Sequence, residues 1–482
     1  MFFDRVKSLD QIMESAEKKG LKRQLGWFDL MMLGVGAIIG TGIFVLTSVA
    51  ANKAGPGMIY SFIIAGVVCA LTALIYAEIA SMVPVAGSAY TYSYAVFGEL
   101  IAWIVGWSLI LEYAIAAGAV AVGWAGYANG FLHSIGAGLP IALTAGPGDT
   151  ITLADGTTGH GAFNLVAFAI SLLVTWLLVI GTSKSAKVTS VLVVVKIVAL
   201  ATFVVLALPA VQSANFEPML PNGWGTPLSG VGVLGAAASI FFAYVGFDAV
   251  STAAEETKNP NVNLPIGLIG SLLICTVFYL LVAYAAVGAV GAQPNGALSQ
   301  SKEPLAFILR ELGYPMVGHL VAWAAIIALP SVILMMIYGQ TRILFTMARD
   351  GLMPKAFTAV HERFHTPHVV TIVTGVFVSL FAAMFPVSML ADISNSGTLF
   401  AFFIVAIGVM VLRVTQPNRP RSFRTPLIWV VGPLAVAGCA LLFVSLGWNP
   451  TIKYFTIWAV IGLVIYFAFA RKNSVMGKLE QK

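Results

Sequence analysis

The stretch Gly34-Val-Gly-Ala-Ile-Ile-Gly-Thr-Gly-Ile-Phe44 lies inside the first long apolar segment of the chain. Its four glycines each weaken a helical backbone by about 1 kcal/mol relative to alanine. In a bilayer, an interrupted helix is tolerated where protein or a water-filled cavity satisfies the freed peptide groups. The stretch therefore predicts either a broken transmembrane helix that binds a solute through its backbone or close helix packing through small residues.

The composition supports a membrane setting. Of the 482 residues, 59% are hydrophobic and only 10% are charged, and the mean hydropathy is +0.93. Soluble domains carry about 25% charged residues, so we expect an all-α integral membrane protein. The three cysteines stand alone in apolar runs and the histidines fall in loops or near segment ends, which predicts neither a disulfide framework nor a metal site.

A membrane-spanning helix needs about 20 mostly apolar residues. Twelve segments satisfy this requirement: 27–51, 56–83, 98–131, 162–181, 186–209, 229–254, 265–290, 317–347, 368–386, 391–414, 426–446 and 452–470. Residues 1–26 mix acidic and basic side chains without an apolar signal region, so a short cytoplasmic amphipathic segment is expected there. Residues 471–482 form a short tail.

The positive charges predict the orientation. Most of the 26 Lys and Arg residues fall in the two terminal segments and in the loops on the same side of the membrane. The exceptions are Lys53, Lys302, Arg310 and Lys453 in the opposite loops, and Lys196 inside a span. Cytoplasmic loops carry the Lys/Arg excess, so both termini are expected in the cytoplasm and the protein in the cell membrane. The net charge of +6 then follows from topology and gives no support for nucleic-acid binding.

A second interruption is expected in the sixth span, Ala238-Ser-Ile-Phe-Phe-Ala-Tyr-Val-Gly-Phe-Asp-Ala249, where aromatic residues surround a single glycine. Interrupted segments at corresponding places in two halves of a chain indicate a transporter site. The offset of five spans fits two inverted repeats, 27–209 and 229–414, with 426–470 as an addition of two helices.

The two interruptions predict a chemistry. Free N–H groups at Gly40, Thr41 and Gly42, with Ile39 beside them, suit a carboxylate. Free carbonyls near the second interruption suit an ammonium group; the residues concerned are Phe242, Ala243, Tyr244 and Val245. A zwitterionic amino acid presents both groups, and Phe242 is a candidate gate over it. The alternative is that these aromatic side chains only pack between helices.

Lys196 lies in an otherwise apolar span. A lysine near the centre of a membrane helix costs about 2.5–3.5 kcal/mol on insertion scales. Burial favours its neutral form, so one hypothesis is that Lys196 gains and loses a proton during transport. The alternative is a lysine that extends to the membrane surface.

Several acidic residues also lie at membrane depth. Glu112 in the third span has three open interpretations: it attracts a cationic side chain, pairs with Lys196, or forms a structural hydrogen bond to a broken helix. For Asp248, a brace on the sixth span is favoured over a proton relay. Glu78 and Asp392 are expected to be structural.

The run His361-Glu-Arg-Phe-His365 matches the zinc-protease pattern H-E-x-x-H. That chemistry requires a continuous helix, whereas Pro367 follows two residues later. Zinc hydrolysis is therefore not expected.

Four motifs together resemble the amino acid–polyamine–organocation superfamily: Gly34–Phe44, Tyr76-Ala-Glu-Ile-Ala-Ser-Met-Val-Pro84 with Gly87 and Tyr90, Phe241–Asp248, and Ala348-Arg-Asp-Gly-Leu-Met-Pro354. Leu111-Glu-Tyr113, Glu255-Glu-Thr-Lys-Asn-Pro260 and Lys196 resemble its cationic amino acid transporter branch, in the shorter bacterial form. The resemblance implies a proton-coupled amino acid symporter in which Lys196 occupies the place of a bound cation, so sodium is not expected.

The resemblance also bears on the substrate. Met335 and Met336 stand where arginine-transporting animal members have smaller residues, and bulky thioethers would shorten the pocket. This favours small neutral amino acids such as alanine as substrates. Because Glu112 is acidic, arginine or lysine remains an alternative substrate. A monomer is expected, with or without a small single-helix accessory protein.

Two alternative functions remain open, one within transport and one outside it. A cationic amino acid or polyamine transporter or exchanger is the alternative within transport. A substrate-sensing receptor or channel is the alternative outside it, although no repeated filter motif is present and the tails are short. A membrane enzyme is disfavoured because no acid, base and nucleophile converge.

Overall fold

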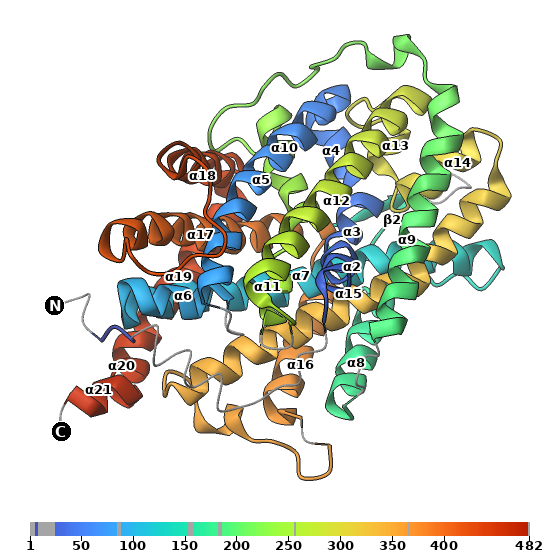
Figure 1. The fold of residues 1–482 in the computed structure, drawn as a ribbon. Coiled ribbons are helices and arrows are strands. Elements are labelled where there is room, and N and C mark those ends of the chain that lie inside the picture. The colour runs from blue at the N-terminus through green and yellow to red at the C-terminus, as the bar shows by residue number, and fades with distance from the viewer. Residues whose placement is uncertain are drawn as a thin grey trace.

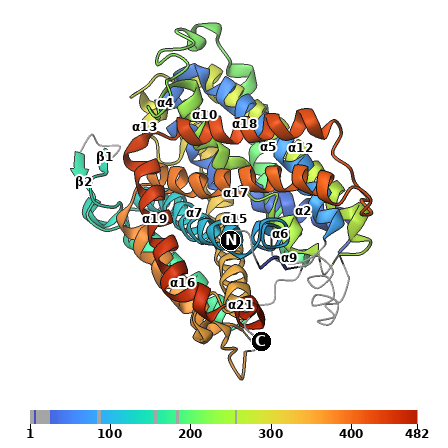
Figure 2. The same ribbon diagram turned by 90° about the vertical axis from the view of Figure 1, so that its left-hand side faces the viewer.

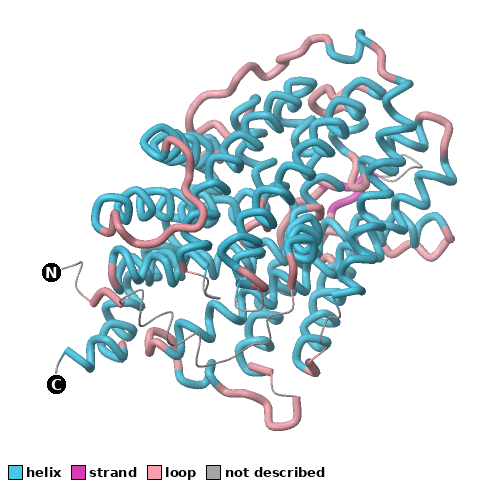
Figure 3. The backbone as a smooth tube through the Cα atoms, in the orientation of Figure 1, coloured by secondary structure: helices cyan, strands magenta, loops and turns pink. Residues whose placement is uncertain are grey.

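The computed structural model describes residues 5–7, 25–83, 88–152, 158–181, 186–254, 257–364 and 366–480, and these are predominantly helical (Figure 3). Most of the expected amphipathic segment 1–26 lies outside the described residues. The same holds for Pro84 and Gly87 of the second motif, for Glu255 and Glu256, and for His365.

Eight helical stretches in the described part are long and apolar enough to cross a membrane. They are Leu46–Met82, which joins α4 (Leu46–Ala54) and α5 (Met58–Met82); α7 (Glu99–Ser134); Ser190–Ala210, most of it in α9 (Ala186–Ala207); α12 (Pro260–Val290); α15 (Pro315–Arg349); α17 (Val387–Thr415); α18 (Ile428–Ser445); and Trp448–Asn473, which contains α19 (Lys453–Ile465). Shorter apolar helices are α2 (Trp27–Ile38), α8 (Leu165–Val179), α10 (Gly232–Tyr244) and α16 (His368–Met384). Each of the twelve expected segments thus contains helix, and the protein is an all-helical, multi-pass membrane protein.

The first apolar segment is interrupted, as its glycines predict. Helix α2 ends at Ile38, and Gly40 has a non-helical backbone with φ −144° and ψ −149°. A single turn, α3 (Thr41–Phe44), follows, and α4 begins after a second irregular residue, Val45. The break therefore falls within the glycine-rich motif.

The sixth segment is interrupted as well. Helix α10 ends at Tyr244, residues 245–248 form a turn, and the short helix α11 (Ala249–Thr252) follows. Gly246 has φ +123°, in a region that L-residues with a side chain rarely adopt, so the single glycine of the motif is where the chain turns.

The packing places both interruptions at the centre of the molecule. Helix α7 is the most enclosed of the eight long stretches, since 83% of its most apolar 18-residue segment is buried. It packs against α15 and α17. Helix α2 packs on α12, and α10 packs on α4 and α5 (Figure 1). Helices α17 and α18 lie side by side and pack on α5, which is behind them in Figure 2.

Small elements connect the spans. They are α6 (Ser88–Phe97), α13 (Ala297–Gln300), α14 (Pro304–Glu311), α20 (Arg471–Asn473), α21 (Val475–Glu480), and an antiparallel pair of strands, β1 (Thr150–Thr152) and β2 (Thr158–His160). The described part of the N-terminal segment lies beside the C-terminal helices α20 and α21. Arg5 Nη1 donates to Glu99 Oε1 at 3.0 Å and to the Arg471 carbonyl at 3.2 Å, which joins the N-terminal segment to the C-terminal tail.

Lys53 does not lie in an external loop, contrary to the expectation from the charge count. It is part of α4, and its Nζ donates to Asp392 Oδ2 at 2.8 Å and to Ser239 Oγ at 2.5 Å. The Ser239 hydroxyl also donates to Asp392. The expected structural role of Asp392 therefore has a geometric basis: it connects α17 to α4 and α10.

Glu78 forms a second buried group of ion pairs, with Arg413 and Arg421. Its carboxylate accepts from Arg413 Nε and Nη2 at 2.6 and 2.7 Å and from the Thr425 backbone N–H at 2.8 Å. Arg421 Nε lies 3.1 Å from Glu78 Oε1, and both side chains are 1% exposed. The acid thus joins α5 to α17 and to the loop that follows α17.

Glu78→Ala is expected to lower the free energy of unfolding in detergent by about 3–5 kcal/mol, because it leaves a buried guanidinium without its counter-charge. Denaturant unfolding of the purified protein, followed by tryptophan fluorescence, measures this. Glu217→Ala is the control, since Glu217 is exposed. Equal stability of the two variants would contradict a structural role for Glu78.

Candidate substrate-binding site

The two interruptions touch each other through their backbones. A Cβ added at Gly42 would lie 2.2 Å from the Cα of Ala243, far inside van der Waals contact. A Cβ at Gly246 would lie 2.9 Å from the carbonyl carbon of Ala37. The glycines therefore allow an approach between the two broken segments that any side chain would prevent.

The first break leaves backbone donors free. Among the described residues, no acceptor is present for the N–H groups of Thr41, Gly42 and Ile43, which begin the single turn α3. Unsatisfied N–H groups at the start of a helical turn carry partial positive charge and attract anions. This edge of the site can therefore accept a carboxylate.

The second break leaves backbone acceptors free. The carbonyl oxygens of Phe242 and Val245 accept no hydrogen bond within the described part of the chain. Carbonyls at the end of a helix carry partial negative charge and attract cations. The two segments, whose backbones touch, thus carry free donors and free acceptors, the two kinds of group that a zwitterion requires.

Tyr279 of α12 joins the two breaks and was not identified from the sequence. Its hydroxyl lies 2.8 Å from the carbonyl oxygens of both Ile38 and Ala243, and it can donate its proton to either. Ile38 is the last residue of α2 and Ala243 lies in the last turn of α10. The only available sequence signal was a tyrosine in an apolar span, because a buried phenol needs a polar partner.

The predicted site residues of the two breaks are all enclosed. The least buried are Phe242 and Val245, at 7% and 5% exposure; the others are Ile39, Gly40, Thr41, Gly42, Ala243 and Tyr244. Two side chains are directed elsewhere, however. The Tyr244 hydroxyl donates to the Phe62 carbonyl of α5 at 3.0 Å, and the Thr41 hydroxyl lies 3.4 Å from the Val120 carbonyl of α7. Only the backbones of these two residues face the opposite break.

Met336 lies on α15, the helix that packs near the first break through Val332. The Val332 side chain would be 3.5 Å from a Cβ at Gly40, and Met336 follows it by one helical turn on the same face. A further turn along, Gly339 packs against the ring of Tyr113. Met336 itself is 6% exposed, so its thioether is enclosed within the bundle.

Lys196 is 1% exposed, and its Nζ donates to the Gly36 carbonyl at 2.8 Å. Gly36 belongs to the last turn of α2, directly before the break. The partner of the buried ammonium is thus the carbonyl end of the broken helix. The predicted pairing with Glu112 is not found in the described part of the chain, where Glu112 Oε2 has no hydrogen-bond partner.

Asp248 connects the second break to α7. Its Oδ2 accepts from the Tyr113 hydroxyl at 2.9 Å, and its carbonyl accepts from the Ser251 backbone N–H at 2.9 Å and from the Ser251 hydroxyl at 2.6 Å. This geometry fits the bracing role expected for Asp248. Glu112, the residue before Tyr113, is 1% exposed and lies in electrostatic contact with Asp248.

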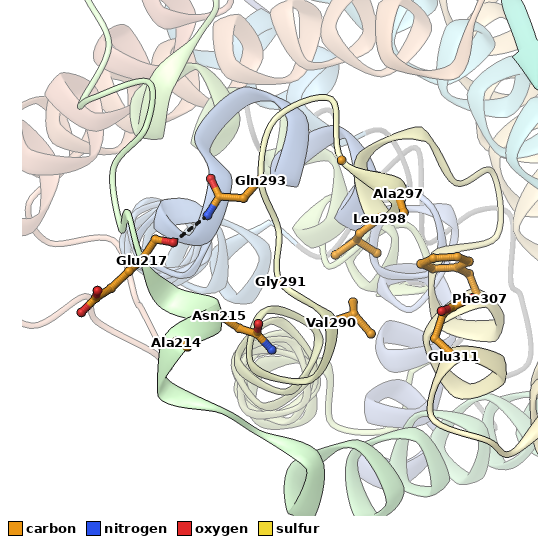
Figure 4. A pocket seen from close by; sticks show the side chains of 11 residues that line it. Ala214, Asn215, Glu217, Val290, Gly291, Gln293, Ala297, Leu298, Phe307 and Glu311 are labelled. Atoms are coloured by element: carbon orange, nitrogen blue, oxygen red, sulfur yellow. Dashed lines mark hydrogen bonds between the residues drawn. The ribbon is translucent and has the colours of Figure 1, made fainter.

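A separate cavity of about 280 Å³ opens at the end of α12, remote from these residues (Figure 4). Val290, Gln293, Leu298 and Phe307 contribute to its lining, and none of the predicted site residues does. The described residues hold no cluster of three His, Cys, Asp or Glu side chains suited to a metal ion. His361–Phe364 of the H-E-x-x-H match form irregular loop, without the helix that zinc catalysis needs.

Broken helices that oppose free backbone donors and acceptors within a membrane bundle define a solute transporter. The model of the amino acid permease family matches residues 25–467, nearly the whole chain. The protein therefore belongs to this family, within the amino acid–polyamine–organocation superfamily, and it is a permease and not an enzyme.

Three relatives illustrate the range of the family. The chain is 45% identical to a branched-chain amino acid permease, BcaP, of Bacillus subtilis over 98% of this chain and 99% of the relative. It is 40% identical to a methylthioribose transporter of the same organism, with coverage of 98% and 99%. A chloroplastic cationic amino acid transporter of Arabidopsis thaliana is 35% identical over 91% of this chain and 74% of the relative.

Proposed function

We propose that this protein imports neutral aliphatic amino acids across the cell membrane by proton-coupled symport. The observation that carries this proposal is the pair of facing breaks, with free N–H groups at Thr41, Gly42 and Ile43 opposite the free carbonyls of Phe242 and Val245. The substrate carboxylate binds the first set and its ammonium group binds the second. Phe242 then covers the bound molecule.

The topology that we propose has twelve spans, both termini in the cytoplasm, and two inverted repeats of five spans. It is supported by the helix in each expected segment, by two breaks that stand five spans apart, and by the Lys/Arg distribution. Alternating access then consists of one helix group moving against the other around the central site.

The proton-coupling group that we propose is Lys196. A charged ammonium binds the Gly36 carbonyl and holds the end of α2 in place. Loss of the proton weakens this charge-assisted hydrogen bond and frees the broken helix to move. Since the protonated ammonium group of Lys196 already occupies the end of α2, a sodium ion is not required there.

The substrate class follows from the side chains near the breaks. Met336 limits the length of the substrate side chain, and the relative that transports branched-chain amino acids supports an aliphatic substrate. Alanine is the smallest member of this class. A second candidate is a cationic amino acid, because Glu112 is buried with one unpartnered oxygen and plant relatives are named for that activity.

The decisive experiment is uptake into proteoliposomes under an inward proton gradient without sodium. Radiolabelled leucine and alanine are expected to accumulate above the external concentration, and arginine is not. Collapse of the gradient with a protonophore should reduce accumulation to equilibrium. Uptake that is indifferent to the gradient would refute proton coupling, and arginine uptake alone would establish the second candidate.

Met336→Ser is expected to extend the substrate range toward longer side chains, including arginine, because it removes a bulky thioether beside the first break. Competition of unlabelled arginine with labelled leucine measures this, with an expected gain in affinity of about tenfold, or 1.4 kcal/mol.

Met335→Ser is the matched control for this change. Met335 is the adjacent residue, about 100° around α15, and it is only half-buried. An equal effect of both substitutions would mean that Met336 does not line the substrate pocket.

A further inference from the structure

Several buried polar atoms without partners gather beside the second break. Within the described structure, no hydrogen bond reaches the hydroxyls of Tyr76 and Tyr92 or Glu112 Oε2. The three residues are 0%, 2% and 1% exposed. More than about 90% of buried polar groups in proteins are paired, so three orphans in one cluster require an explanation.

The residues of this cluster come from segments far apart in the chain. Tyr76 lies on α5 and Tyr92 on α6, and their ring centroids are 6.3 Å apart. The Tyr76 ring also lies 5.9 Å from that of Phe247, which is part of the second break. The polar cluster therefore borders the break directly.

The cluster is rich in hydrogen-bond acceptors and adjoins two carboxyl groups, those of Asp248 and Glu112. The Tyr76 phenol lies near the carboxyls of both Asp248 and Glu112 and near the Ser88 hydroxyl, which also has no hydrogen-bond partner among the described residues. The Tyr92 phenol also lies near the carboxyl of Asp248. The neighbouring Ser251 hydroxyl donates to the Asp248 carbonyl, so towards Tyr92 it can only accept, and the acceptor positions of the Tyr92 oxygen remain open.

We infer that these side chains form a second binding site for the ammonium group of the substrate, next to the broken helices on the side of the chain ends. This inference rests on the proposed function. Carboxylates bind ammonium groups by charge-assisted hydrogen bonds, and aromatic faces attract cations. As the substrate moves from the central site toward the cytoplasm, its ammonium group needs hydrogen-bond acceptors. The unpartnered oxygens of Tyr76, Tyr92 and Glu112 supply them.

The position of the cluster gives the site its role. Asp248 comes three residues after Val245, whose free carbonyl belongs to the central site. Helix α6 contains Tyr92 and Tyr94, and the Tyr94 hydroxyl donates to Glu99, the residue that binds Arg5 of the N-terminal segment. The cluster thus lies between the central site and the side where the termini meet, which is the cytoplasmic side in the proposed topology.

The test uses Tyr76→Phe and Tyr92→Phe, each of which removes one unpartnered oxygen and preserves the ring. Tyr60→Phe is the matched control, because Tyr60 is exposed at the surface. Leucine uptake is measured in right-side-out and in inside-out membrane vesicles. We expect both variants to raise the half-saturating leucine concentration about tenfold from the cytoplasmic side and to leave the value from the outer side unchanged.

Methylammonium is the second probe, since it carries the ammonium group alone. It is expected to inhibit leucine uptake in inside-out vesicles of the wild type and to lose this effect in Tyr92→Phe. If the wild type transports leucine but neither variant changes the cytoplasmic value, the orphan atoms bind only water and the second site is refuted. If the wild type transports no amino acid from either side, it is the proposed function that fails.

Discussion

Gly42→Ala is expected to weaken amino acid binding strongly while leaving the protein folded in the membrane. The added methyl group would lie 2.2 Å from the Cα and 2.5 Å from the Cβ of Ala243, so the two broken segments must separate. Overpacking of this kind costs about 1–3 kcal/mol, and here the strain falls on the backbone groups that bind the substrate. We expect affinity for leucine to fall by about 100-fold.

Ligand-dependent thermal stabilisation of the purified protein measures this effect, because a substrate stabilises only the state that binds it. Gly118→Ala is the matched control: Gly118 lies on α7, and a Cβ there would meet its nearest neighbour, Leu390, at an ordinary 3.6 Å. A Gly42→Ala protein that leucine stabilises like the wild type would exclude the contact between the two breaks as the substrate site.

Lys196→Ala is expected to eliminate proton-driven accumulation, because it removes the only side chain that we assign to proton transfer. Lys196→Arg keeps the positive charge but cannot release a proton, since a guanidinium stays protonated in proteins. It therefore distinguishes the role of the charge from the role of proton transfer. The arginine variant should bind leucine and still fail to accumulate it against a gradient. For both variants the ratio of internal to external leucine should approach equality in proteoliposomes.

The control for this pair is Lys453→Ala, which removes an exposed lysine at the start of α19. It should accumulate leucine as the wild type does. Gradient-driven accumulation by Lys196→Arg would show that another group carries the proton, and the assignment of Lys196 would then be wrong.

Much of the architecture could be predicted from local sequence properties. Hydropathy alone located the helices, since each span must by itself satisfy its backbone in lipid. The glycines of Gly34–Phe44 and Gly246 indicated where the helices break, and the structure places both breaks there. The family resemblance was confirmed by the permease match over residues 25–467.

Contacts between spans could not be predicted in the same way. Glu112 and Lys196 are opposite charges at membrane depth, yet the lysine binds the Gly36 carbonyl. The position of Tyr279 in an apolar span indicated only that its hydroxyl needs a polar partner, not that it reaches both breaks. A helix that is apolar on all sides has no periodic pattern to show which of its faces points inward.

Sequence by itself determined that this is a multi-pass membrane protein, which segments form apolar helices, and where two of them lose their helical form. These properties depend on side-chain hydropathy and on glycine, which act within a few residues along the chain. Tertiary structure alone decided that the two breaks touch, that Tyr279 and Lys196 anchor their carbonyls, and that Tyr76, Tyr92 and Glu112 gather beside Asp248. The rotation and depth of each helix, which bring these groups together, are set by packing between segments that are distant in the chain.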